Sequence, residues 1–209
     1  MHWKQDLISR VERRVHAAPV ALPGTERLAT APRANLEYRR VALSGTYLAD
    51  KSALVRAATT LGTGYWAMHA MRLDDGRTIW VNRGFVPAGT TAEDLDATTP
   101  TGAREVTGLL RASEPGGSLL QSNRPDEGRW YSRDTAALST RFGLEQAPSW
   151  FVDAQAETGG AAAPALQPVA GLTVIRFPNN HLGYALTWFA LAALSLVGIG
   201  LAWRRPIGD

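Results

Sequence analysis

The feature that most constrains this chain is a long uncharged segment near its C-terminus. No Asp, Glu, Lys or Arg occurs from Phe177 to Trp203, and Arg204 and Arg205 follow at once. Because a helix rises about 1.5 Å per residue and a bilayer core is about 30 Å thick, roughly 20 apolar residues cross it. The segment therefore predicts a transmembrane helix over 179–203, followed by a cytoplasmic tail, 204–209.

Composition excludes several classes of protein. The 22 basic and 19 acidic residues give a net charge of +3, far from the concentrated basic patches of a nucleic-acid-binding protein, so no nucleic acid is expected as a partner. Cysteine is absent, which removes disulfides, thiolate nucleophiles and cysteine-based metal sites. The sequence contains no nucleophile-elbow motif, no zinc-protease motif, no Walker motif and no dinucleotide-binding motif. We therefore expect no enzymatic activity.

The segment before the uncharged run predicts one mainly β domain. Apolar residues at every fourth position predict a juxtamembrane amphipathic helix over 1–18. Alternating strand patterns then predict a compact antiparallel β domain over 36–177, with a barrel or sandwich architecture. The clearest of these patterns predict a hairpin at 65–87 and strands near 39–48, 104–112, 149–156 and 172–177. A helix is predicted at 135–142, capped by Asp134 and Gly143, and a flexible linker or loop at 157–168.

Charge also predicts how the chain is oriented. Arg204 and Arg205 at the end of the span favour a cytoplasmic C-terminus, which places the β domain on the periplasmic side of a bacterial inner (plasma) membrane. Residues 1–20 contain no apolar segment that could direct export. Either the topology is inverted or a further apolar span lies upstream of Trp3, and we expect the second.

Two motifs carry a family resemblance. VNRGFVP (81–87) and NNHLGYALTWFALA (179–192) resemble signatures of the Surfeit locus protein 1 family, which are assembly factors for cytochrome c oxidase, and the N-terminal segment 3–23 is similar to the stretch after that family's first membrane helix. The resemblance implies a membrane-anchored assembly factor that binds haem a and aids its insertion into the large oxidase subunit. It also implies membrane lipid as an environment and haem a synthase as a second candidate partner.

The resemblance implies that His181 is the axial ligand of the haem iron. A helix N-terminus disfavours a positive imidazolium, so a neutral imidazole there can donate a lone pair to iron. Tyr184 and Trp188 follow at helical spacing and share a face with His181, where they could contact the macrocycle. From the residues alone, a capping or snorkelling histidine and two interfacial aromatics explain the pattern as well.

Arg83 is a further candidate haem-binding residue. It follows Ile79 and Val81 at period two, so it can point to their side and would then need an anionic partner, either a carboxylate or a haem propionate. Alternatively, Gly84 makes a bulge that turns Arg83 toward solvent or a local salt bridge. His69 and His16 are candidates for a second axial ligand, although structural roles explain both. A cofactor-free scaffold that stabilises a nascent oxidase subunit is the alternative function.

Overall fold

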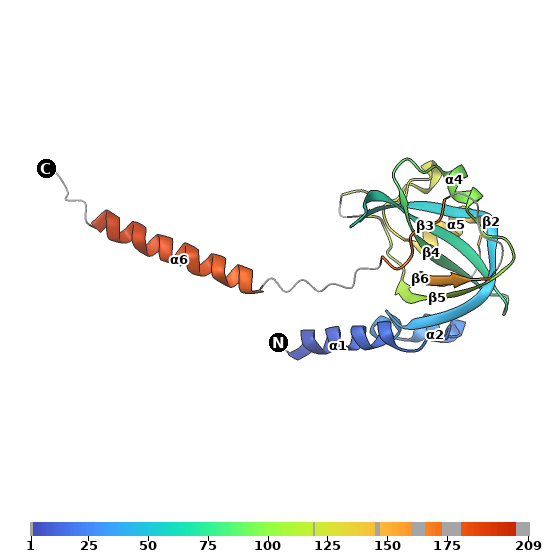
Figure 1. The fold of residues 1–209 in the computed structure, drawn as a ribbon, viewed down its shortest axis with the longest axis horizontal. Helices are drawn as coiled ribbons and strands as arrows, with labels where there is room; N and C mark the ends of the chain where they lie inside the picture. The colour runs from blue at the N-terminus through green and yellow to red at the C-terminus, as the bar shows by residue number, and fades with distance from the viewer. Residues whose placement is uncertain (1, 119, 145–146, 160–165, 173–180, 204–209) are drawn as a thin grey trace. The chain divides into compact units, whose positions relative to one another are not determined.

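The computed structural model describes residues 2–118, 120–144, 147–159, 166–172 and 181–203. The chain divides into two units, 1–173 and 174–209. The first unit contains a β-barrel and the N-terminal helices, and the second contains the helix α6 (His181–Trp203). Figure 1 shows the elements of both units.

Five strands close the barrel in the first unit. They are β2 (Arg40–Thr59), β3 (Gly62–Leu73), β4 (Thr78–Pro87), β5 (Ala103–Ala112) and β6 (Trp150–Thr158). The sheet runs in the order β2-β3-β4-β6-β5, and β5 pairs again with β2. All these pairs are antiparallel except β4 with β6, and a short β1 (Val20–Ala21) adds a parallel edge to β2. The predicted mainly β fold is confirmed, and its architecture is a barrel.

The long strand β2 makes closure possible. Its first part, Arg40–Thr46, pairs with β5, whereas Ser52–Thr59 pairs with β3. The pairing register with β3 shifts between Tyr47 and Ser52, where Asp50 adopts a positive φ of 55°. A bulge bends a strand and increases its twist, so one strand can belong to both sides of the barrel.

Buried apolar side chains form the core. Met71 and Leu110 belong to one cluster of it, whereas Trp80, Phe151 and Met68 belong to another, which also contains Leu138. Outside the strands, α1 (His2–His16) buries Val11, and α5 (Thr135–Phe142) buries Leu138. The Trp80 indole N–H donates to the Ser139 hydroxyl of α5 at 3.0 Å, so the ring is buried without losing its hydrogen bond.

Local sequence signals placed two elements correctly. The hairpin predicted at 65–87 is β3 and β4, which turn at Asp74-Asp75-Gly76, where Gly76 has φ +84°. The helix predicted at 135–142 is α5. The Asp134 carboxylate accepts from the Ala137 N–H at 3.1 Å, and Gly143 ends the helix in a left-handed conformation.

Other elements differ from the sequence prediction. Three short helices were not predicted: α2 (Thr25–Thr30), α3 (Arg33–Leu36) and α4 (Ala92–Ala97). β6 continues through Glu157 and Thr158, the first two residues of the segment predicted as a linker, because these residues still pair with β5. Within that linker, 160–165 lies outside the described residues, as does most of the strand predicted at 172–177.

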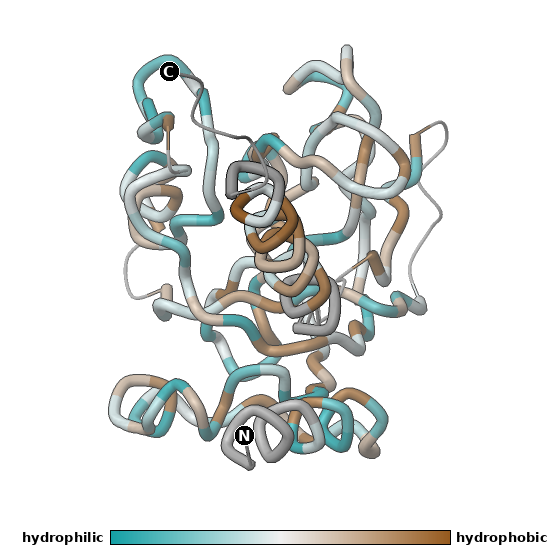
Figure 2. Tube along the Cα trace, turned by 90° about the vertical axis from the view of Figure 1, so that its left-hand side faces the viewer, coloured by the Kyte–Doolittle hydropathy of each residue, from teal (hydrophilic) through white to brown (hydrophobic). Residues whose placement is uncertain are grey.

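The second unit is described only by α6. Its large apolar side chains between residues 186 and 200 are exposed, and Figure 2 colours this part of the helix mainly as hydrophobic. Among the described residues, no helix meets the combined length and hydropathy required to cross a membrane.

Candidate functional site

Three of the residues predicted to bind haem, namely His181, Tyr184 and Trp188, belong to α6. His181 is its first residue, and Tyr184 and Trp188 follow within two turns, at a spacing that puts them on one helical face. The side chains of His181 and Tyr184 lie outside the described residues. Trp188 is 69% exposed, so its indole is available to a ligand, a lipid or a partner.

Arg83 lies inside the barrel, where β4 makes a bulge. Trp66 of β3 pairs with Phe85 and Met68 pairs with Asn82, so β4 has one extra residue there, and Gly84 adopts φ +133°. The bulge expected at Gly84 is therefore present. It does not turn Arg83 into solvent, since that side chain is only 8% exposed.

The anionic partner of Arg83 is a carboxylate from the protein itself. Its Nε donates to Glu157 Oε1 at 3.1 Å, and one terminal nitrogen donates to the Thr98 carbonyl at 2.9 Å. The guanidinium also lies 5.2 Å from the ring centroid of Tyr47, which packs in the same core as Ile79 and Val81. Arg83 thus points to the side that the alternating pattern predicted, and Glu157 already neutralises it.

Glu157 joins Arg83 to two further polar side chains. The Tyr47 hydroxyl donates to Glu157 Oε1 at 2.8 Å, and the Tyr47 ring meets His69 edge-on with 5.8 Å between centroids. Arg83, Glu157, Tyr47 and His69 come from β4, β6, β2 and β3, and we call them the Arg83 cluster. Sequence reasoning missed Glu157 and Tyr47, because their proximity arises only when the barrel closes.

Burial sets the protonation of the Arg83 cluster. It lowers the pKa of His69 to about 3, assisted by the charge of Arg83. The nearby backbone groups of Ala67 and Leu95 oppose this shift, although neither ring nitrogen reaches hydrogen-bonding geometry with a described group. Burial, followed by the negative charge of Glu157, raises the pKa of Tyr47 well above its ordinary value. At neutral pH, His69 and Tyr47 are therefore both uncharged.

The two candidates for a second axial ligand occupy different environments. His69 is fully buried in the barrel interior. His16 is exposed at the end of α1, where its Nδ1 lies 2.8 Å from the Glu12 carbonyl. A ligand could reach His16 directly, whereas it could reach His69 only if the barrel opened.

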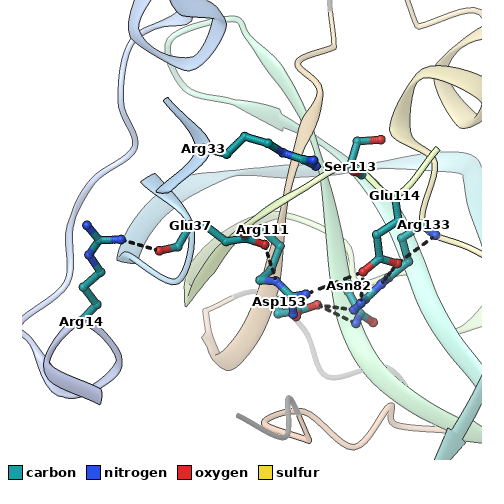
Figure 3. A network of polar contacts seen from close by, with 9 residues as sticks. All are labelled: Arg14, Arg33, Glu37, Asn82, Arg111, Ser113, Glu114, Arg133 and Asp153. Atoms are coloured by element: carbon teal, nitrogen blue, oxygen red, sulfur yellow. Dashed lines mark hydrogen bonds and ion pairs between the residues drawn. The ribbon is translucent and has the colours of Figure 1, made fainter. Parts of the chain in front are cut away.

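A second polar group, which we call the Asp153 network, surrounds the carboxylate of Asp153 (Figure 3). Asp153 is 2% exposed and accepts from Asn82 at 2.8 Å, from Arg111 at 3.1 Å and from Arg133 at 3.2 Å. Arg133 also pairs with Glu114 at 2.6 Å. The network links β4, β5 and β6 to the segment that precedes α5.

The charges of the Asp153 network are matched to one another. Burial lowers the pKa of Arg133, but the carboxylates of Asp153 and Glu114 outweigh this effect and raise it above its ordinary value. Burial likewise raises the pKa of Glu114, but Arg133 and then Arg111 outweigh it and hold that pKa below its ordinary value. Each of these charges is therefore matched by an opposite one.

Comparison with known proteins identifies the family. The sequence model of the SURF1 family matches residues 1–193, so this chain belongs to the SURF1 family. It is 31% identical over 206 residues to a SURF1-like protein of Monosiga brevicollis, which covers 92% of this chain and 75% of that protein.

Two mammalian relatives match over a similar range. The chain is 30% identical to Surfeit locus protein 1 of Rattus norvegicus over 208 residues, and 30% identical to that of Homo sapiens over 213 residues. Each match covers 91% of this chain, with 64% of the rat protein and 66% of the human one. The chain thus spans just under two thirds of the length of these mammalian relatives.

Proposed function

We propose that this protein is a membrane-anchored assembly factor of cytochrome c oxidase, which binds haem a through His181 and aids its insertion into the large oxidase subunit. Membership of the SURF1 family supports the role in oxidase assembly. The observation that carries the haem site is that α6 begins at His181, which is the only residue of the helix able to carry a positive charge. Haem a synthase is a further proposed partner.

The residue types at the start of α6 suit the binding of a haem. His181 would supply the axial imidazole, which a helix N-terminus favours in its neutral form. Tyr184 and Trp188 would lie against the macrocycle, and the whole haem a is the group to be passed to the oxidase subunit. The protein's own part is to hold and release the cofactor rather than to catalyse a reaction, so we propose no enzymatic role.

We also propose that α6 is the membrane anchor. The absence of charged residues from 177 to 203 and the exposure of large apolar side chains, including Phe189 and Leu194, support this assignment. Arg204 and Arg205 support an orientation with the C-terminus in the cytoplasm and the barrel on the outer face of the inner membrane. In a bacterium that face is the periplasm.

A cofactor-free scaffold is the second candidate function. The specific observation in its favour is that Arg83 is already neutralised by Glu157, so this arginine needs no haem propionate to satisfy its charge. Under this alternative, the barrel and α6 stabilise a nascent oxidase subunit without carrying haem.

Replacement of His181 tests the two functions. The full chain is produced in cells that make haem a and purified in detergent, and haem a is measured by its absorption spectrum. We expect His181→Ala to remove most of the retained haem a, because the iron loses its protein ligand. Leu196→Ala, on the same helix, is the control and should retain haem a. An undiminished spectrum in the His181→Ala protein, at equal protein recovery, would favour the scaffold.

A second pair of variants tests the helical face. Trp188 and Leu196 are 69% and 70% exposed on the same helix, so they make a matched pair. We expect Trp188→Ala to weaken haem retention and Leu196→Ala to leave it unchanged. Equal losses from both would indicate general destabilisation of α6 and would argue against a defined haem-binding face.

A further inference from the structure

A groove lined by arginines lies beside the end of α1. It has a volume of about 400 Å³ and is formed by the end of α1, the connection to β1, the helices α2 and α3, and the start of β2. We call it the arginine groove. Its lining residues are Arg14, Ala17, Ala18, Val20, Arg27, Asn35, Arg39 and Arg40.

Two of its arginines are fixed by neutral oxygens. Arg14 donates to the Ala34 and Glu37 carbonyls at 2.7 and 3.0 Å, near the end of α3. Arg40 donates to Gln155 Oε1 at 3.1 Å. These bonds hold the side chains in place but do not neutralise their charge.

The other two arginines, Arg27 and Arg39, have no side-chain partner in the part of the chain that the structure describes. Among the described residues, the guanidinium groups of Arg27 and Arg39 form no hydrogen bond and no ion pair, and Arg39 is half-buried. None of the residues that line the groove is acidic. By contrast, Arg83, Arg111 and Arg133 in the barrel are each paired with carboxylates.

The arginine groove is therefore a site of unbalanced positive charge. Burial lowers the pKa of Arg14, and the charges of Arg10, Arg39 and Arg13 lower it further. Holding several guanidinium groups together without a counter-ion costs free energy, and a bound anion would remove that cost.

We propose that the arginine groove binds the phosphate group of an anionic phospholipid. The planar guanidinium fork matches phosphate oxygens, and no aromatic side chain lines the groove to stack on a base or a porphyrin. The groove volume of about 400 Å³ is many times the roughly 30 Å³ that one water molecule occupies. It therefore leaves room for more of a ligand than a single phosphate group. Ala17, Ala18 and the exposed Val20 add apolar surface beside the charges, which suits an amphiphile better than free phosphate.

This site goes beyond the proposed function, since it requires neither haem nor His181. Through this site, the first unit would have its own contact with the membrane surface. Anionic lipid there would orient the N-terminal end of the barrel toward the headgroups.

Titration of the full chain in a neutral detergent tests the site. The probes are dihexanoyl-phosphatidylglycerol, dihexanoyl-phosphatidylcholine and inorganic phosphate, each followed by calorimetry below its micelle-forming concentration. The anionic lipid should bind more tightly than both others. In the Arg27→Gln/Arg39→Gln variant its affinity should fall about 30-fold, since each basic residue at an anionic surface changes affinity about fivefold.

The matched control is Arg56→Gln/Arg72→Gln, which removes the same charge from two exposed strand positions outside the groove. It should bind the anionic lipid like the unmodified chain. An equal loss in this control would show that net charge alone attracts lipid and would overturn the site. Inorganic phosphate binding as tightly as the anionic lipid would overturn the lipid assignment. Haem retention is a separate measurement, so failure of either proposal is recognised independently.

Discussion

His69 is a buried residue whose pKa makes stability depend on pH. Its pKa is lowered to about 3 in the folded state, whereas the unfolded chain has the ordinary value near 6.5. The charged or titratable groups around it are Arg83 on β4, Tyr47 on β2 and Glu157 on β6, and Tyr47 is neutral across the acidic range. Between the two pKa values the unfolded state binds the extra proton, so stability is complete above about pH 6.5 and falls as pH decreases.

We therefore predict that lowering the pH from 7 to 5 decreases the free energy of unfolding by about 2 kcal/mol through His69 alone. The decrease is about 1.4 kcal/mol for each pH unit below 6.5. The variant His69→Leu should lose this dependence without loss of stability at neutral pH, because it removes buried ring nitrogens that reach no hydrogen-bonding geometry with a described group. Urea unfolding of the full chain in detergent, followed by tryptophan fluorescence, measures the effect. His16→Leu, at an exposed position, should keep the original slope. Identical slopes in all three proteins would contradict the assigned burial of His69.

At the scale of elements, the bulge in β4 determines where the Arg83 side chain lies. A Cβ on Gly84 would overlap the Val169 carbonyl oxygen, and φ at this position is +133°. The close approach is fixed by reciprocal hydrogen bonds between Phe85 and Val169, at 3.0 and 2.9 Å. Glycine is therefore required both by the backbone conformation and by the neighbouring segment at Val169.

Gly84→Ala should destabilise the protein by about 2 to 4 kcal/mol, because it combines an unfavourable φ with a steric overlap. Gly76→Ala is the control that separates the two effects. Gly76 also has positive φ, but open space surrounds its would-be Cβ, so this change should cost only about 1 kcal/mol. Chemical denaturation of both variants measures the difference. If the two substitutions lower the free energy of unfolding equally, the steric overlap with Val169 contributes nothing to the loss of stability.

The short helices show why some elements escaped the sequence prediction. α5 was found because Asp134 and Gly143 mark its ends and its length allows an apolar face. α4 has an equally complete capping box between Thr91 and Asp94, but it is a single short helix between strands and buries only Leu95. A cap signal predicts where a helix can begin, whereas packing against β2 decides whether so short a helix forms.

At the scale of the whole molecule, the proposed anchor can be tested by one charge. Leu194 is 73% exposed near the middle of α6. We expect Leu194→Arg to reduce retention in the membrane, since an arginine at the centre of a spanning helix costs about 3 kcal/mol or more. Leu194→Ile keeps the apolar surface and is the matched control. Extraction of isolated membranes at high pH, followed by immunoblotting of pellet and supernatant, measures retention. Full retention of the arginine variant would show that α6 is not the anchor.

The sequence by itself determined the features that depend on neighbours along the chain. Alternation predicted the strands, Asp134 and Gly143 predicted α5, the turn at Asp74-Asp75-Gly76 predicted the hairpin, and the motifs at 81–87 and 179–192 predicted the family. These signals are local, because strand period, capping and turn conformation depend on residues only a few positions apart.

Only the tertiary structure decided which distant residues meet. Barrel closure brings Glu157 to Arg83 and Tyr47, and Arg111 and Arg133 to Asp153, across separations of 20 to 110 residues. The packing of the N-terminal helices near the start of β2 also gathers Arg14, Arg27, Arg39 and Arg40 around one groove. Charges such as these look ordinary in sequence, because whether an arginine is paired, buried or left without a counter-ion depends on the strand that closes beside it. The physical reason is that electrostatic free energy depends on distance and burial in space, neither of which is encoded in a local pattern.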